Sequence, residues 1–141
     1  DLYRGQLDRL FNSTTKLGLA EYLRGQANLD QVIVNTTSPN LSLIGRGQSS
    51  DEISISSHQT HFAQLIQQVR AQYDYIILSA APVLAASDCL TLAQFTGFNL
   101  CLVQYAQTQL KDIELAKSYF EKADNEGYGM EDCVAVYKVI K

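Results

Sequence analysis

The chain has 141 residues, of which 46% are hydrophobic and 18% are charged, and its formal net charge is −4. This composition can supply the core of one ordinary domain and argues against intrinsic disorder. The acidic balance gives no basic field to attract phosphates, so it also argues against a general nucleic-acid binder. No apolar run approaches the roughly 18 residues that a membrane span needs, although the domain could be attached to a membrane segment outside this sequence.

The first part of the sequence predicts short elements. The segments "GQLDRLFN" (5–12) and "LGLAEYLRGQA" (17–27) have apolar residues at helical spacing. Residues 28–31 can add one further helical turn. The runs "QVIV" (31–34) and "NLSLIG" (40–45) are flanked by Asn, Ser and Pro, as is typical of strands.

The clearest helix is predicted for "HFAQLIQQVRAQY" (61–73). Its apolar residues recur every three or four positions, whereas Gln and Arg occupy the other positions. The face expected to be buried consists of Phe62, Leu65, Ile66 and Val69.

Strands and helices alternate in the second half. The segment "YIILS" (75–79) is a continuous apolar run, as expected of a strand covered on both faces in a parallel sheet. The remaining predicted elements are a helix at 87–95, a strand at 99–105, a helix at 108–123 with Leu110, Ile113, Leu115 and Phe120 inside, and a strand at 133–140. This order predicts an α/β fold with a mostly parallel sheet flanked by helices.

Ser79 ends the strand predicted at 75–79, and ligands of open α/β folds bind beyond the carboxyl ends of the strands. An acid would be expected there in a phosphate-handling enzyme. A neutral hydroxyl holds a magnesium-bound water poorly and cannot accept a proton near neutral pH. The helix at 87–95 is expected to be capped by Ser87 or by Asp88, which lies nine residues after Ser79, and such an N-cap is worth about 1 kcal/mol.

The stretch "GRGQSS" (45–50) is the sole hint of a phosphate-binding loop. One residue separates its glycines, no Lys follows, and a P-loop needs four residues between glycines and then Lys. We therefore interpret this stretch as an ordinary flexible loop.

The cysteines and histidines give no strong metal motif. Cys89, Cys101 and Cys133 show no C-x-x-C spacing and are expected to be small buried hydrophobes in a reducing compartment. His58 and His61 are three residues apart, which without a third ligand makes a weak metal hypothesis. We predict no metal site from these residues.

Several quoted segments resemble, in order, the bacterial tyrosine kinase domain of the Wzc type. They are "DLYRG" (1–5), "GLAEYLRGQANL" (18–29), "NLSLIGRGQ" (40–48), "FAQLIQQVRAQYDYIILSAAPVLAASD" (62–88) and "VQYAQTQLKDIELAKSYFE" (103–121). This is the cytoplasmic domain of polysaccharide co-polymerases, which control capsule and exopolysaccharide chains. The resemblance implies a P-loop NTPase fold that transfers phosphate from MgATP to a tyrosine cluster on a neighbouring subunit of a ring.

The resemblance also assigns positions to the family's motifs. Asp1 matches the second Asp of the Walker A′ motif, and Ser79 stands where the Walker B Asp is expected. The Walker A loop and its strand would precede residue 1, so residues 1–141 are expected to form a single kinase-like domain truncated at its N-terminus. The sequence "SSDEISISS" (49–57) replaces a proline-rich stretch, and no tyrosine cluster ends the chain.

These departures predict a pseudokinase that serves as a regulatory or interaction domain, with no cofactor bound. The implied partners are other co-polymerase subunits and the polysaccharide polymerase and export machinery, at the cytoplasmic face of the inner membrane. An alternative is an active tyrosine autokinase, which uses MgATP and an upstream P-loop, with Asp1 or Asp88 compensating for Ser79. A third is an α/β domain that binds another partner through the emptied site.

The absent upstream strand has a physical consequence. In the family it lies beside the Walker B strand, so residues 75–78 are expected to have an unpaired edge and exposed apolar faces. We expect that the chain belongs to a longer protein, that a partner strand fills the gap, or that the sheet has rearranged.

Overall fold

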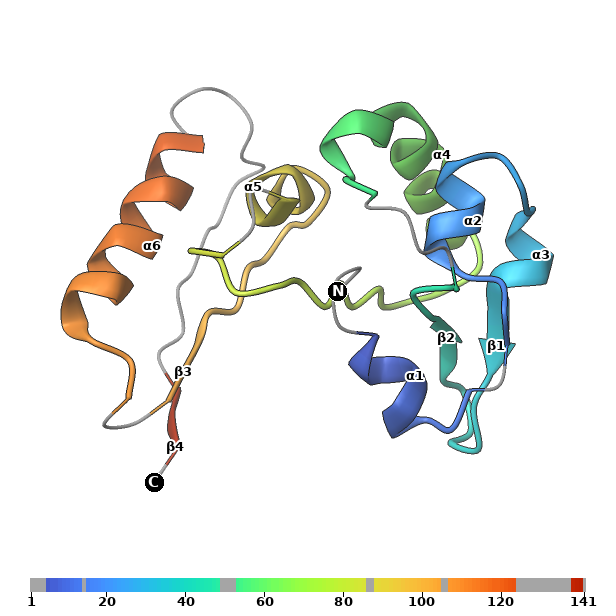
Figure 1. Cartoon of the computed structure of the whole chain (residues 1–141), viewed down its shortest axis with the longest axis horizontal. Helices are drawn as coiled ribbons and strands as arrows, with labels where there is room; N and C mark the ends of the chain where they lie inside the picture. The colour runs from blue at the N-terminus through green and yellow to red at the C-terminus, as the bar shows by residue number, and fades with distance from the viewer. Residues whose placement is uncertain are drawn as a thin grey trace. The chain divides into compact units, whose positions relative to one another are not determined.

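The structure is a computed structural model that describes residues 5–13, 15–48, 53–85, 88–104, 107–123 and 138–140. The chain divides into two compact units, Asp1–Ala81 and Pro82–Lys141, and each is described by itself (Figure 1). The single domain expected over residues 1–141 stays a prediction.

Three short helices begin the first unit: α1 (Gln6–Leu10), α2 (Leu19–Leu23) and α3 (Leu29–Val32). They confirm the helices predicted at 5–12 and 17–27, with narrower bounds, and the further turn at 28–31. The start of α3 is fixed by a capping box. The Asn28 side chain accepts a hydrogen bond from the Gln31 backbone N–H at 3.1 Å, and the Gln31 side chain accepts one from the Asn28 N–H at 2.9 Å.

A small antiparallel hairpin follows, made of β1 (Ile33–Asn35) and β2 (Ser42–Ile44). Val34 lies opposite Leu43 in its register. The first strand begins two residues later than predicted, because residues 31 and 32 still belong to α3. Both predicted strands are therefore present, in antiparallel pairing.

Helix α4 (Gln59–Arg70) follows a short 3₁₀ turn (Ser56–His58) and provides much of the core of the first unit. Its buried residues are the four predicted: Phe62, Leu65, Ile66 and Val69. They share the core with Leu23, Val32, Leu43, Ile53 and Ile55. The 3.6-residue period of the sequence alone was enough to predict this face.

The strand predicted at 75–79 does not form. Residues 75–80 have neither helix nor strand hydrogen bonding, and Tyr75 and Ile77 are each 89% exposed. A strand is stabilised by ladder hydrogen bonds to a neighbour, and no strand of the described chain pairs with this segment. The strand prediction is therefore wrong for this chain, whereas the expected exposure of its apolar residues is confirmed.

The second unit contains α5 (Asp88–Ala93), β3 (Leu102–Gln104), α6 (Leu110–Ala123) and β4 (Lys138–Ile140). The two strands pair in parallel, with Val103 opposite Val139. The parallel arrangement expected from the alternating elements is present in this pair. The strand predicted at 99–105 is limited to residues 102–104, and residues 133–137 lie outside the described chain.

The buried stripe of α6 differs from the prediction. Leu110 is 69% exposed and Leu115 is 43% exposed, whereas Ala116 is 5% exposed. Ile113 is half-buried and lies one helical turn before Ala116, so these two share a face. Leu115 was assigned to the wrong face because two helical positions from Ile113 correspond to a rotation of about 200°.

Candidate functional site

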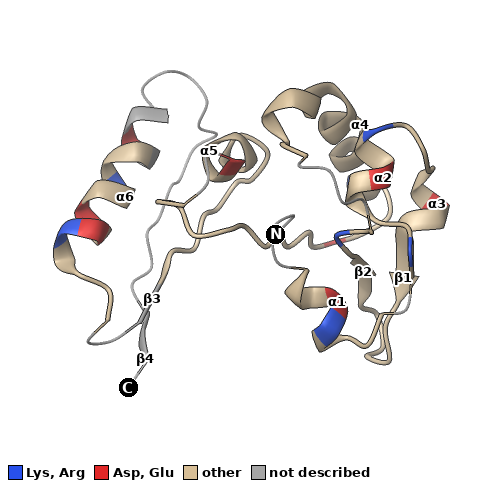
Figure 2. Ribbon diagram, in the orientation of Figure 1, with Lys and Arg blue, Asp and Glu red and all other residues tan. Residues whose placement is uncertain are grey.

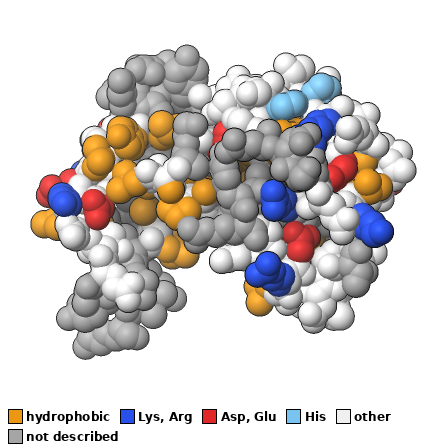
Figure 3. Space-filling model, viewed as in Figure 1, with side chains coloured by type: hydrophobic (Ala, Val, Ile, Leu, Met, Phe, Trp, Pro, Cys, Tyr) orange, Lys and Arg blue, Asp and Glu red, His pale blue; other side chains and the backbone are white. Residues whose placement is uncertain are grey.

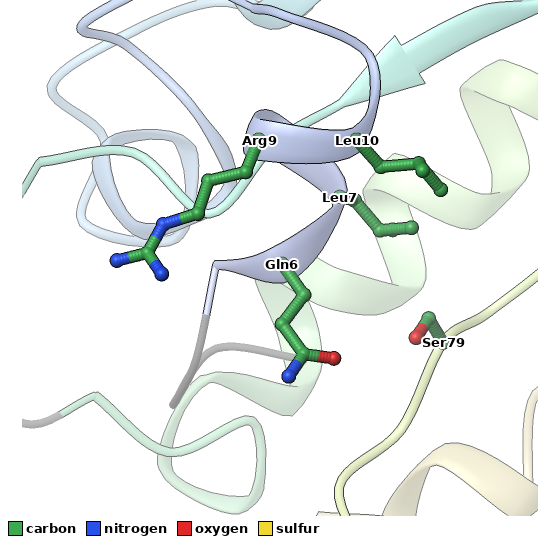
Figure 4. Close-up of a pocket in the computed structure, with 5 residues that line it drawn as sticks. All are labelled: Gln6, Leu7, Arg9, Leu10 and Ser79. Atoms are coloured by element: carbon green, nitrogen blue, oxygen red, sulfur yellow. The ribbon is translucent and has the colours of Figure 1, made fainter.

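Ser79 borders a hollow in the first unit, opposite α1. The lining residues are Gln6, Leu7, Arg9, Leu10 and Ser79, and the hollow has a volume of about 440 Å³. In Figure 4, Leu7 and Leu10 extend from α1 toward the side where Ser79 lies, and the amide of Gln6 and the guanidinium of Arg9 leave the helix in other directions. Ser79 thus lies at a concave surface, although the strand that was predicted to end there is not formed.

The chemistry of this lining does not fit a magnesium ion. Magnesium is held in proteins mainly through carboxylate oxygens and waters. The polar groups around the hollow are an amide, a guanidinium and a hydroxyl, with no carboxylate among its lining residues. Within the described residues, no group of three or more His, Cys, Asp or Glu side chains is arranged to hold a metal ion.

Asp1 and Asp88 are the two acids considered as substitutes for a Walker B carboxylate. Asp1 lies outside the described residues. Asp88 belongs to the second unit, where it is 4% exposed and is the first residue of α5. Ser87, the other predicted cap, lies outside the described chain. The N-cap role of Asp88 and its compensating role both stay predictions.

The "GRGQ" turn (45–48) is held by two carboxylates, as its backbone hydrogen bonds show. Asp8 Oδ2 accepts a hydrogen bond from the Arg46 N–H at 3.0 Å. Glu21 Oε1 accepts one from the Gln48 N–H at 3.2 Å, and Glu21 Oε2 accepts one from the Gly18 N–H at 2.8 Å. Side chains of α1 and α2 therefore satisfy N–H groups that a phosphate-binding loop would offer to its ligand.

Backbone groups of α2 complete the same attachment. The Leu19 N–H donates to the Gly45 carbonyl at 2.9 Å, and the Ala20 N–H donates to the Arg46 carbonyl at 3.0 Å. These are two of the N–H groups that a helix leaves unpaired in its first turn. The carbonyl groups of the turn thus cap the N-terminus of α2, while the Glu21 carboxylate holds the turn in place.

Three glycines permit this close approach. A Cβ on Gly18 would collide with the backbone of residues 45–47. Gly47 has φ +90°, a value that other residues rarely adopt, and a Cβ there would collide with the Glu21 carboxylate. A Cβ on Gly45 would likewise collide with the Asp8 carboxylate. Packing therefore explains both glycines of "GRGQ", which supports rejection of the P-loop interpretation.

Sequence reasoning missed this attachment and described residues 45–50 as an ordinary loop. One local signal was available, because Glu21 follows Gly18 by three residues at the start of an apolar helix, the spacing of half a capping box. No local pattern connects Asp8 with Arg46, which lie 38 positions apart. Gln6 and Arg9 were likewise missed, because α1 was assigned only its apolar stripe.

The described cysteines and histidines agree with a structural role. Cys89 is a buried free thiol and Cys101 a half-buried one, as expected, and Cys133 lies outside the described chain. Burial raises the pKa of the Cys89 thiol above its usual 9.0, and Asp88 and Cys101 act in the same direction. His58 Nδ1 lies 3.0 Å from the Ser54 carbonyl oxygen, and His61 is exposed.

The sequence matches tyrosine-protein kinases of several bacteria. It is 42% identical to the tyrosine-protein kinase ptk of Acinetobacter johnsonii over 123 residues, which are 87% of this chain. It is 29% identical to the tyrosine-protein kinase etk of Escherichia coli K12 and 27% identical to the tyrosine-protein kinase wzc of Salmonella typhimurium. The chain is a relative of the Wzc-type bacterial tyrosine kinase domains. No protein-family model matches it.

Solved structures agree with this relationship. The kinase domain of the Escherichia coli tyrosine kinase ETK superposes with a TM-score of 0.80 at 26% identity, over 99% of this chain and 53% of that one. The chimerical protein CapA2B2 gives a TM-score of 0.85 at 19% identity, over 99% of this chain and 59% of that one, which shows the fold alone. The α/β fold expected from the sequence is therefore that of the Wzc-type kinase domain.

The match covers a small part of the full-length relatives. The chain spans 17% of the length of the Acinetobacter and Escherichia kinases, and about half of the solved ETK kinase domain. Among the described residues, no helix has the length and hydrophobicity needed to cross a membrane. The activity and partners of the whole protein are therefore matters for proposal.

Proposed function

We propose that this chain is the kinase-like region of a protein of exopolysaccharide or capsule biosynthesis and export, and that it acts as a regulatory or interaction domain without transferring phosphate. The similarity to Wzc-type kinases over 87% of the chain supports the first part. The second part depends on one observation: a serine stands at position 79, where the resemblance expects the Walker B acid.

The physical reason lies in the needs of phosphoryl transfer. Catalysis of this reaction depends almost entirely on positioning and on neutralising the charge of the phosphates, for which the metal ion is central. MgATP would be the cofactor of an active domain. The residues around Ser79 supply donors and a positive charge, which suits neither the binding of Mg²⁺ nor the orientation of its waters.

The same resemblance supplies the proposed cellular setting. We place the domain at the cytoplasmic face of the bacterial inner membrane, tethered through a segment outside this chain. Its partners would be other subunits of a co-polymerase assembly and the polysaccharide polymerase and export machinery. The two compact units would then serve as surfaces for these partners.

The competing function is an active tyrosine autokinase. It is favoured by the names of the relatives, which are tyrosine-protein kinases. In that case a P-loop outside this chain would supply the phosphate site, and Asp1 or Asp88 would replace the missing acid.

The experiment compares the two functions in the full protein that carries this chain. Magnesium-dependent ATP binding is measured by calorimetry, and tyrosine labelling is measured with ATP radiolabelled at its γ-phosphate. We expect neither in the parent protein and a gain of magnesium-dependent ATP binding in Ser79→Asp. Ser79→Asn is the matched control, because Asn has nearly the shape of Asp but no charge. ATP binding and tyrosine labelling by the parent would refute the pseudokinase proposal.

A further inference from the structure

The two histidines of the chain lie about one helical turn apart at the start of α4. His58 ends the 3₁₀ turn, and His61 is the third residue of α4. Residues three positions apart on a helical surface have Cβ atoms about 5–6 Å apart, and metal ligands of helical proteins use this spacing. In the space-filling view the histidine side chains, in pale blue, gather on one face of the first unit (Figure 3). Both rings can therefore reach one ion.

The backbone already fixes one ring nitrogen of His58. Its Nδ1 lies 3.0 Å from the Ser54 carbonyl oxygen. A carbonyl oxygen only accepts, so Nδ1 carries the proton of this hydrogen bond, and in the neutral ring Nε2 keeps its lone pair. Histidines that bind metals usually make the same contact through their other nitrogen, because it fixes the tautomer and the orientation of the ring. The Ser54 contact thus adds support that the spacing of the two histidines did not supply.

The other ring nitrogens are available to a ligand. Among the described residues, Ser54 is the one hydrogen-bond partner of the His58 ring, and the His61 side chain has none. His61 is exposed and His58 is half-buried, so an ion can approach from solvent. Once the first nitrogen binds an ion, the second is held nearby at a high effective concentration, so the pair binds more tightly than two separate histidines.

The surroundings of the pair select the class of ion. From Ile53 to Val69 the sequence contains no Asp, Glu, Lys or Arg, so this stretch offers no carboxylate. Mg²⁺ and Ca²⁺ are held by oxygen ligands, whereas imidazole suits Zn²⁺, Cu²⁺ and Ni²⁺. The partial positive charge at the N-terminus of α4 also works against an ion held by charge alone. The affinity must therefore come from the two nitrogen ligands.

We propose that His58 and His61 together bind one divalent transition-metal ion of the class that prefers imidazole, represented by Zn²⁺. Nε2 of His58 and one ring nitrogen of His61 are the protein ligands, and water completes the coordination. The bound ion links the 3₁₀ turn to α4 and so stabilises the start of this helix. The inference goes beyond the proposed function, because neither histidine lines the hollow at Ser79.

The first experiment titrates the chain with zinc chloride and follows the imidazole proton signals by NMR. With two histidines in the chain, the signal that disappears in His61→Gln assigns both. We expect the two signals to shift together and to saturate at equal concentrations of zinc and protein, and magnesium or calcium chloride to leave them unchanged. A shift of the His61 signal alone, or an equal response to magnesium, would overturn the proposal. Zinc bound to cysteine thiols elsewhere does not produce the paired shift.

The second experiment distinguishes a chelating pair from two independent histidines. His61→Gln should weaken zinc binding at His58 about tenfold or more, because a single imidazole remains. The matched control combines His61→Gln with Gln67→His at an exposed position. Position 67 lies about 14 Å along the helix axis from His58, too far to share an ion. This control restores the number of histidines and should not restore the affinity, and recovery of zinc binding in it would refute the pair.

Thermal unfolding gives a separate measure of the same site. Zinc should raise the Tm of the parent chain and leave that of His61→Gln nearly unchanged, because a ligand that binds the folded state stabilises it. Without metal the two proteins should have similar Tm values, since His61 is exposed. An equal rise in both would contradict the site. The test of the proposed function is unaffected by either result, because it measures ATP binding and tyrosine labelling with both histidines intact.

Discussion

The GRGQ turn (45–48) and the segment at 75–80 both belong to stretches that resemble the kinase family, yet they differ in hydrogen bonding and in exposure. Hydrogen bonds to α1 and α2 hold the turn in place. The carboxylates of Asp8 and Glu21 accept from N–H groups of the turn, and N–H groups of α2 donate to its carbonyls. The segment at 75–80 belongs to no helix or strand, and two of its large apolar side chains are 89% exposed. A turn needs a few donors and acceptors nearby, whereas a buried strand needs neighbours along its whole length.

Charge and surface properties differ between the regions of the structure as well. Lys residues are interspersed with Asp and Glu along α6, where Lys117 and Glu121 form an exposed ion pair at 3.4 Å (Figure 2). Hydrophobic side chains gather over part of the second unit in the space-filling view (Figure 3). The exposed large hydrophobic residues of this unit include Phe98, Leu100 and Leu102. Alternate apolar residues are thus exposed before and at the start of β3, in the same pattern as at Tyr75 and Ile77.

The largest change in the free energy of unfolding is expected for a variant in the core that the turn and the hairpin share. Phe62→Ala in α4 removes a side chain that is 1% exposed. We expect a loss of about 3–5 kcal/mol in the free energy of unfolding, because a cavity replaces the ring. Urea denaturation followed by circular dichroism measures it. A loss below about 1 kcal/mol would mean that α4 is not packed as described.

Gly47→Ala tests the turn directly. We expect a loss of about 2–3 kcal/mol, because the backbone at φ +90° is strained for alanine and the new Cβ displaces the Glu21 carboxylate from its donors. Gly25→Ala is the matched control, since Gly25 has φ +71° but an added Cβ meets nothing within 4 Å. It should lose about 1 kcal/mol. Equal losses in the two variants would show that the carboxylate contact contributes nothing.

Glu21→Gln tests the carboxylate with the turn glycines intact. One oxygen can still accept a hydrogen bond, so we expect a loss of about 1–2 kcal/mol from the weaker pairing with Gly18 and Gln48. Urea denaturation measures this loss. Glu114→Gln, at an exposed position of α6, is the control and should change stability by less than about 0.5 kcal/mol.

The smallest change in stability is expected for a substitution in the segment at 75–80. Ile77→Lys should change the stability of this chain by less than about 0.5 kcal/mol, because the side chain is already 89% exposed. Val69→Lys, at a position 6% exposed, is the contrasting variant and should be strongly destabilising.

The same Ile77→Lys variant also tests self-association. Size-exclusion chromatography should show association of the parent chain and less association of the variant, since a charge blocks pairing at an exposed edge. A highly soluble monomeric parent would contradict the expected unfilled edge. A large loss of stability in Ile77→Lys would show that the segment is packed in this chain.

The parts of the fold that were predicted correctly depend on local signals. The face of α4 follows from apolar residues every three or four positions, and the start of α3 follows from the capping residues Asn28 and Gln31. At the candidate site, the sequence argued against a P-loop at 45–50, whereas the strand that should have ended at Ser79 is not formed. The role of Asp1 stays a prediction, because residues 1–4 lie outside the described chain.

The sequence by itself predicted the helices and the α/β class, because these follow from local periodicity and from the order of the elements. The tertiary structure decided that Asp8 and Glu21 hold the GRGQ turn, that Gln6 and Arg9 share a hollow with Ser79, and that Leu115 lies outside the buried stripe of α6. It also decided that residues 75–79 form no strand. These features depend on which distant segments meet, and hydrogen bonds or burial between distant segments leave no periodic signal in the chain.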